Sequence, residues 1–350
     1  MSAKSAIGVN ISTTCVRAAE ISIHGGVLRL DRFGQVPLPV GSVIDGEVID
    51  THAVASALKQ LWKAAHFRSR KVILGVSNQR VLVRQAELPV MDEAERRSSL
   101  RFQVADLVPM GVDEAVLDFI PMEEFDRGAM RMHRGLLVAA AQDTVLGAIA
   151  AASEAGLETI QVDLTPFAVL RSVALDGRHG RQGTAEAVVD IGARVTNIVV
   201  HENGVPRFVR VLMMGGDTIT ETLVDKAGLK PSEASAVTMN PQTVTSVDAT
   251  LVQRVLAQAL GALVDEVRSS VDYYRASSTG GALSRLVLTG GASRLPQMAE
   301  RMAATMNVTV VPGTPFAGLD TSKSALTEEQ LRYVEPMASV PVGLALGGLR

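Results

Sequence analysis

The sequence begins each of its halves with the same strand–turn–strand pattern. Residues 7–22 read IGVNISTTCVRAAEIS, and residues 187–200 read AVVDIGARVTNIVV. In both stretches an apolar run enters a turn of small residues and a second apolar run leaves it, which is typical of two strands joined by a turn. A unit that recurs at the start of each half indicates a duplicated fold. The 350 residues are therefore expected to form two lobes.

Strand-like and helix-like runs alternate along the chain, which is the pattern of an α/β protein. Strands are expected at 6–11, 16–22 and 26–35, followed by a helix at 50–67. The apolar segment at 339–350, SVPVGLALGGLR, is too short to span a membrane and has no basic face for lying on lipid. It is expected to form a helix packed against the first lobe.

Composition and charge exclude several classes of protein. Apolar residues make up 47% and charged residues 20% of the chain, as in a folded globular protein. The formal charge of −3 provides no basic field for nucleic acid. Cys15 is the single cysteine, so an intrachain disulfide is excluded and a reducing compartment is expected. The first residues lack the apolar core of a secretory signal. A cytoplasmic protein is expected, either free or held at a membrane by a partner.

The character of the sequence changes after Pro89. Asp92 followed by Glu95 is a capping-box pattern for a helix start, and strand and helix candidates continue to about Ile160. This block is expected to be a small α+β subdomain inserted into the first lobe. The Gly-rich and charged loop at 175–187 is expected to cross between the lobes.

Three turns at strand ends are rich in glycine or hydroxyl residues, and a glycine pair opens a helix. The turns are residues 12–15, 190–193 and 290–293, and the pair is Gly215–Gly216. Such turns present backbone amides to an anion, and a helix start adds its dipole. Their recurrence at strand ends in both halves predicts a nucleotide site between the two lobes.

Few side chains in these turns carry chemistry. Asp190 is the one carboxylate, and it either contacts Mg²⁺ through water or stabilises its turn. Thr196 either donates to a phosphate or is an ordinary strand residue. Cys15 lacks a nucleophile motif and reads as a small turn residue. Lys226 and Glu233 either flank a ribose or adenine or lie on the surface.

Several stretches resemble the actin-like ATPase superfamily, which includes actin and FtsA. GGDTIT at 215–220 and LVLTGGASRLPQM at 286–298 carry this resemblance together with the two repeats. The chain is more closely similar to the PilM family of type IV pilus assembly proteins. That similarity rests on four further stretches: ALKQLWKAAHFRSRKVILGVSNQRVLVRQAELP, LVPMGVDEAVLDF, ASEAGLETIQVDLTPFAVLRS and EVRSSVDYYRAS.

The resemblance implies a two-lobed actin-like α/β fold with ribonuclease-H-like repeats and an FtsA-type 1C subdomain inserted in the first lobe. The implied division is subdomain 1A at 1–84 and 161–182 with a C-terminal helix at about 336–350, 1C at 85–160, 2A at 183–216 and 283–335, and 2B at 217–282.

PilM proteins bind ATP between their lobes and dock the short N-terminal cytoplasmic tail of the membrane protein PilN. They thereby link the inner-membrane platform to the motor proteins of the pilus. The resemblance implies ATP and Mg²⁺ as cofactors and a location at the inner face of the cytoplasmic membrane through the partner, without membrane insertion. The implied cofactor-binding residues are Asn10, Ser12, Thr13, Thr14, Cys15, Asp190, Gly192, Ala193, Thr196, Gly215, Gly216, Lys226, Gly290, Gly291 and Ser293, with Asp190 contacting the metal through water.

The chain departs from the family pattern at residues that hydrolysis would use. Where the family typically reads Asp-Ile-Gly-Ser-Ser, residues 10–14 read Asn-Ile-Ser-Thr-Thr. Asn10 replaces a carboxylate that holds the water shell of the metal, and Ser12 replaces a glycine near phosphate. Thr165 stands where many relatives have a Glu that orients the attacking water. Because phosphoryl transfer depends on positioning and charge, these losses should slow chemistry more than they weaken binding.

Three functions fit these observations. The first is an interaction scaffold that binds ATP, with weak or absent hydrolysis, and docks a PilN-like peptide between the first lobe and the insert at 85–165. The second is an enzyme, either a slow ATPase or a small-molecule kinase of the same superfamily. The third is a degenerate member that has lost its nucleotide, which Asp190 and the glycine pairs argue against. Self-association and the kind of pilus system stay open. The scaffold is the preferred interpretation.

Overall fold

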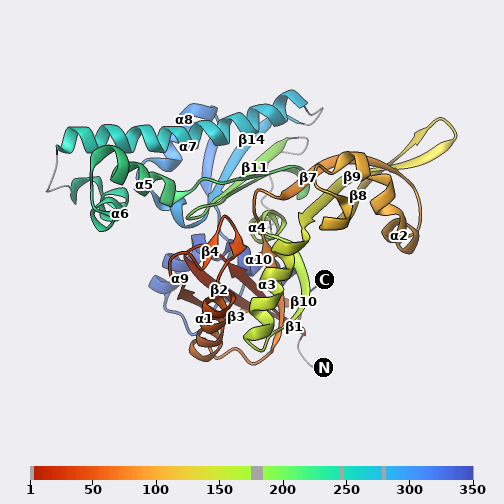
Figure 1. The fold of residues 1–350 in the computed structure, drawn as a ribbon, viewed down its shortest axis with the longest axis horizontal. Helices are drawn as coiled ribbons and strands as arrows, with labels where there is room; N and C mark the ends of the chain where they lie inside the picture. The colour runs from red at the N-terminus through yellow and green to blue at the C-terminus, as the bar shows by residue number, and fades with distance from the viewer. Residues whose placement is uncertain (1–3, 175–183, 244–247, 278–280, 350) are drawn as a thin grey trace.

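The computed structural model describes residues 4–174, 184–243, 248–277 and 281–349. Two five-stranded sheets form the cores of two lobes, ordered β10-β6-β1-β2-β3 and β13-β12-β11-β14-β15 (Figure 1). The first sheet consists of β1 (Lys4–Ile11), β2 (Cys15–His24), β3 (Val27–Pro37), β6 (Lys71–Val76) and β10 (Glu158–Leu164). The second consists of β11 (Ala185–Ile191), β12 (Thr196–Glu202), β13 (Val205–Leu212), β14 (Leu283–Thr289) and β15 (Thr309–Pro312).

The two sheets have the same topology. In each, three consecutive antiparallel strands are followed by two strands that lie parallel to the first of them. The turn between the first two strands is closed by the same backbone hydrogen bond, from Ser12 N to Cys15 O at 3.0 Å and from Gly192 N to Val195 O at 2.9 Å. The duplication predicted from the sequence is therefore confirmed.

Four helices cover the first sheet. They are α1 (Thr51–Ala64), α3 (Gln142–Glu154), α4 (Thr165–Val173) and α10 (Ser339–Gly347). The Asp50 carboxylate caps α1 by accepting a hydrogen bond from Ala53 N at 2.9 Å. The C-terminal helix α10 packs on α4 and β1, as predicted, and nearly all of its side chains are buried.

The helices of the second lobe share one core with one face of its sheet, and the opposite face packs in the core of the first lobe beside α4. These helices are α5 (Gly216–Ala227), α6 (Pro231–Met239), α7 (Ala249–Ser277) and α8 (Met298–Met306). The long α7 runs along the outer side of this lobe (Figure 1) and buries Val267, Val271 and Tyr274 in the core. Shorter elements are β4 (Val43–Ile44), β5 (Glu47–Val48), α9 (Glu328–Val334) and the 3-10 helices η1 (Ala105–Leu107), η2 (Val112–Glu114), η3 (Pro241–Thr243), η4 (Gly291–Arg294) and η5 (Glu335–Met337).

The insert is a three-stranded antiparallel sheet, ordered β7-β9-β8, with one helix. Its elements are β7 (Val81–Pro89), α2 (Glu93–Gln103), β8 (Ala115–Arg127) and β9 (Met130–Ala141). It projects beside the first lobe, with the β8–β9 hairpin at its far end (Figure 1). Asp92 caps α2 as predicted, because its carboxylate accepts a hydrogen bond from Glu95 N at 2.8 Å.

The sheet of the insert spans 81–141, whereas the sequence assigned 85–160 to it. The helix α3 packs on α1, and β10 pairs in parallel with β6, so both belong to the first lobe. The sequence did not separate them because α3 follows β9 without a glycine or proline between them. The predicted crossing at 175–187 lies largely outside the described residues.

None of the helices in the described ranges combines the length and hydropathy that crossing a bilayer requires.

Candidate functional site between the lobes

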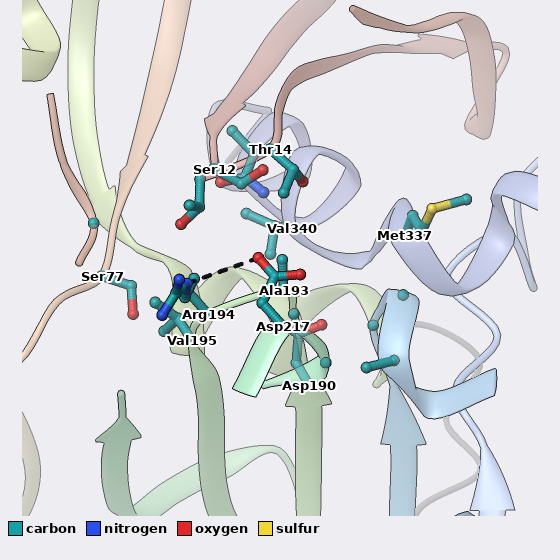
Figure 2. A pocket seen from close by; sticks show the side chains of 18 of the residues that line it. Ser12, Thr14, Ser77, Asp190, Ala193, Arg194, Val195, Asp217, Met337 and Val340 are labelled. Carbon is teal, nitrogen blue, oxygen red and sulfur yellow. Dashed lines mark ion pairs between the residues drawn. The ribbon is translucent and has the colours of Figure 1, made fainter. Parts of the chain in front are cut away.

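A cavity of about 300 Å³ lies between the two lobes, where the equivalent turns of the two sheets face each other. Figure 2 shows Ser12 and Thr14 of the first lobe across this cavity from Asp190 and Asp217 of the second. The cavity brings together most of the residues predicted from the sequence. Those that line it are Asn10, Ser12, Thr13, Thr14, Asp190, Gly192, Ala193, Gly216, Gly290 and Gly291.

Gly290 shows why one of the predicted turns requires glycine. Its φ is +90°, and a Cβ atom there would lie 2.3 Å from the carbonyl oxygen of Ile191. The end of β14 therefore passes directly against the backbone of β11, which is possible only without a side chain. This close approach holds the ends of β11 and β14 together where they line the cavity.

Two predicted residues do not line the cavity because their side chains turn inward. Cys15 is buried, with its Sγ 3.4 Å from the Ser12 hydroxyl oxygen. The Thr196 hydroxyl donates to the Met214 carbonyl oxygen at 2.8 Å, which ties β12 to the segment before α5. The structure gives both residues a role in holding a turn.

Four further residues named from the sequence also lie outside the cavity lining. Gly215 is the N-cap of α5, and Lys226 is exposed in the last turn of the same helix. The Ser293 hydroxyl donates to the Gly290 carbonyl oxygen at 2.6 Å. Glu233 caps α6 by accepting a hydrogen bond from Lys230 N at 3.2 Å.

A hydrogen-bonded network joins the lobes at the base of the cavity. The hydroxyls of Ser77 and Thr165 in the first lobe donate to Asn197 Oδ1 at 2.6 and 3.2 Å. Asn197 Nδ2 in turn donates to Asp190 Oδ2 at 3.0 Å. Thr165 is therefore a partner of Asn197, and its hydroxyl sits against the second lobe. Sequence reasoning missed Ser77 and Asn197.

Burial raises the pKa of the Asp190 carboxyl to about 6, and the hydrogen bond from Asn197 and the charge of Arg17 act against that rise. Burial also raises the pKa of the Asp217 carboxyl, while the charge of Arg194 opposes this. Arg194 pairs with Asp217 at 3.8 Å (Figure 2) and with Glu221. One guanidinium therefore serves two carboxylates on the α5 side of the cavity, and the charge of Glu221 adds to the rise of the Asp217 pKa.

Asp190→Asn is expected to stabilise the protein at pH 7 and above, with the gain shrinking towards pH 4. The raised carboxyl pKa means that the folded state binds the proton more tightly than the unfolded state. The stability of the unmodified chain therefore falls as the pH rises from about 4 to about 6, by about 3 kcal/mol at 1.4 kcal/mol per pKa unit. The asparagine variant lacks this loss.

Thermal unfolding of both proteins between pH 4 and pH 8 measures this prediction. Asp225→Asn, at an exposed position on α5, is the matched control and should leave the pH profile unchanged. Parallel profiles for Asp190→Asn and the unmodified chain would contradict the prediction.

The fit of Mg²⁺ to the cleft depends on its carboxylates. Within the described ranges, no group of three or more His, Cys, Asp or Glu residues is arranged to hold a metal ion. Asp190 already accepts a hydrogen bond from Asn197, Asp217 pairs with Arg194, and Asn10 is neutral. Mg²⁺ prefers one or two carboxylates together with phosphate oxygens and water. The residues therefore do not fit a metal whose water shell is held between two carboxylates.

A second cavity, of about 520 Å³, lies between the insert and the first lobe. Apolar side chains of β8, β10 and α4 line it, among them Val116, Val162 and Phe167. Arginines of α2 also line it: Arg96, Arg97 and Arg101. Because β8 is the outer strand of its sheet, its outward edge forms no ladder with another described strand. We call this cavity the insert groove.

The duplicated sheets and the cleft between them define an actin-like two-lobed protein. MreB5 of Spiroplasma citri bound to AMPPNP has this fold, with a TM-score of 0.52 and 10% identity over 98% of this chain and 95% of that one. The chain belongs to the family of the type IV pilus assembly protein PilM, whose family model matches residues 8–349. The structural match to the PilM-PilN type IV pilus biogenesis complex has a TM-score of 0.86 and 27% identity, over 99% of this chain and 98% of that one.

The cell division protein FtsA of Streptococcus pneumoniae serotype 2 (strain D39 / NCTC 7466) is also similar. It is 24% identical over 348 residues, which cover 87% of this chain and 74% of FtsA. The resemblance stated from the sequence is confirmed at the level of the family and of the actin-like fold.

Proposed function

We propose that the chain is a cytoplasmic scaffold of type IV pilus assembly that docks the N-terminal tail of a PilN-like membrane protein and binds ATP in its cleft. The observation that carries the proposal is the likeness of the whole chain to the PilM-PilN complex, at 27% identity and a TM-score of 0.86. The partner would hold the protein at the inner face of the membrane, and the scaffold would link it to the motor and platform proteins.

The cleft supports a nucleotide through its shape and its backbone. Turns from both lobes converge on one cavity, and the start of α5 adds a helix N-terminus. MreB5, which shares the fold, is bound to AMPPNP in its structure. The predicted Mg²⁺ role has weaker support because Asp190 is the one carboxylate at the strand ends and is already engaged by Asn197.

The cleft gives little support to hydrolysis. Thr165 cannot accept a proton from water as a carboxylate can, and its hydroxyl is bonded to Asn197. Asn10 is likewise no base. A kinase or ATPase of this superfamily would need such a group beside the phosphates. The neutral residues at these two positions favour the scaffold over the enzyme, since Asp190 is engaged by Asn197 and Asp217 by Arg194.

Calorimetric titration with ATP, followed by phosphate release from the same sample, is expected to show binding with almost no turnover. We expect a rate no faster than about 10⁻³ s⁻¹, the scale of a phosphoryl-transfer site that lacks its charge-stabilising groups. The reason is that the backbone turns that bind are intact, whereas the water-positioning residue is missing. Rapid multiple turnover would favour the enzyme instead.

The insert groove supports docking of an extended apolar peptide. The outward edge of β8 can pair with an added strand, which is a common mode of peptide recognition. Val116 is 46% exposed beside this edge and offers apolar area for a peptide side chain to cover. Arginines of α2 border the same space, and Arg101 lies 3.6 Å from Asp113.

Val116→Glu tests the docking site without disturbing the core. It is expected to weaken binding of the PilN-like N-terminal peptide by about tenfold or more, because the carboxylate would lose water when the peptide covers it. Fluorescence anisotropy of a labelled peptide measures the affinity. Val27→Glu, at a 55% exposed position outside the groove, is the matched control. Equal affinities for the two variants would contradict this placement of the peptide.

A further inference from the structure

The internal duplication allows the two turns of the cleft to be compared position by position. Within the second lobe, Asp190 on β11 lies opposite Asn197 on β12. At the equivalent position of the first lobe, Asn10 on β1 lies opposite Arg17 on β2. The second lobe thus has a carboxylate beside an amide, and the first lobe has an amide beside a guanidinium. The same site of the repeat is more positive by two charges in the first lobe.

Arg17 brings this positive charge to the cavity wall, where its charge reaches the Asp190 carboxylate but forms no ion pair with it. Its Nε donates to Gln35 Oε1 at 3.1 Å, and its Nη2 donates to the Met337 sulfur at 3.6 Å, so both partners are neutral. Arg17 and Met337 both line the cavity. No ion pair of Arg17 occurs among the residues that the structure describes. Arg194, by contrast, is paired with Asp217 and Glu221.

A cation beside the phosphate turns changes which ligand the cleft favours. A guanidinium offers several N–H donors in a planar fork that fits phosphate oxygens and keeps its charge at any ordinary pH. The same charge repels a divalent cation placed between the two turns. Asn10 supplies no carboxylate to offset that repulsion, and Asp190 has one oxygen engaged by Asn197.

We infer that the cleft binds the phosphates of its nucleotide without Mg²⁺, with the guanidinium of Arg17 supplying the positive charge that the metal supplies elsewhere. The inference rests on the proposed ATP site, and it specifies that the ligand is ATP free of Mg²⁺. The cleft would then bind metal-free ATP. Phosphoryl transfer would still require a metal ion, so binding and hydrolysis would have different metal requirements.

The decisive experiment is calorimetric titration of the full chain with ATP in EDTA and, separately, in excess Mg²⁺. We expect dissociation constants that agree within about threefold, because no group of the cleft selects the metal complex. Binding of ATP only in the presence of Mg²⁺ would overturn the inference and leave the proposed nucleotide function standing. Absence of binding in both conditions would overturn both.

Substitutions at the two unlike positions of the repeat sharpen the test. Arg17→Gln is expected to weaken ATP binding in EDTA by about tenfold or more, because one charge-assisted contact to phosphate is lost. Arg210→Gln, at an exposed position on β13 outside the cavity, is the matched control. Asn10→Asp is expected to make binding depend on Mg²⁺.

Thermal melting shows whether each variant is folded, and Arg17→Lys keeps the charge while losing the fork. Full ATP affinity of folded Arg17→Gln in EDTA would overturn the assignment of the charge to Arg17. Metal-independent binding by Asn10→Asp would also count against it.

Discussion

Removing residues 81–141 and joining Arg80 to Gln142 through a short Gly-Ser linker is expected to abolish binding of the PilN-like peptide while keeping the ATP site. The cut is feasible because Val81 pairs with Ala140 across β7 and β9, so the new ends lie about one strand spacing apart. The insert provides β8 and α2 to the groove, and without them the peptide has neither an edge strand nor a second wall.

The ATP affinity of the deletion variant is its internal control. None of the residues that line the cleft lies between 81 and 141. The two lobes should therefore still bind nucleotide, although removal of Leu136 and Val138 from the edge of the first core should lower the melting temperature. Fluorescence anisotropy and calorimetry on one preparation measure both affinities. A peptide affinity that survives the deletion would place the docking site on the lobes instead.

The sequence predicted the architecture of the lobes well because a duplicated turn is a local pattern. The two turns carry their own signature of small residues between apolar runs, and the structure closes both with the same hydrogen bond. Gly290 was predicted for the same reason. Glycine is required there because the tight turn after β14 brings the Ile191 carbonyl oxygen within 2.3 Å of where a Cβ atom would lie.

The hydrogen-bonded network at the base of the cleft was not predicted, because its members lie far apart along the chain. Asn197 stands inside the apolar run VTNIVV and reads as an ordinary strand residue. Only the strand register, which sets it opposite Asp190, reveals that its amide faces a buried carboxylate. Ser77 lies 120 residues away from it in sequence. Aligning the two repeats residue by residue would have identified both Asn197 and Arg17.

The predicted end of the insert at residue 160 lies too far along the chain for a different reason. The sequence shows where the composition changes, but it does not show which sheet each later strand joins. Parallel pairing of β10 with β6 crosses from residue 158 to residue 71 and leaves no local mark. Strand pairing between distant segments is decided by packing. A boundary predicted from local composition therefore included α3 and the start of β10 in the insert.

Gly343→Ala is expected to destabilise the protein strongly through the contact between α10 and α4. A Cβ at this position would lie 1.7 Å from the carbonyl oxygen of Ala168 and 2.4 Å from its carbonyl carbon, and both are backbone atoms that cannot rotate away. The Gly343 carbonyl also accepts a hydrogen bond from Arg171 Nη1 at 2.6 Å. The two helices must separate, so we expect a loss of about 3 kcal/mol or more and a melting temperature lower by about 6 °C or more.

Gly261→Ala provides the matched control, because it makes the same substitution in a helix where nothing lies within 4 Å of the added methyl group. Replacing glycine by alanine inside α7 should raise stability by up to about 1 kcal/mol, since alanine has the higher helix propensity. The same change should thus have opposite signs at the two positions. If Gly343→Ala also stabilised the protein, the close packing of α10 against α4 would be wrong, and with it the position of the C-terminal helix on the sheet of the first lobe.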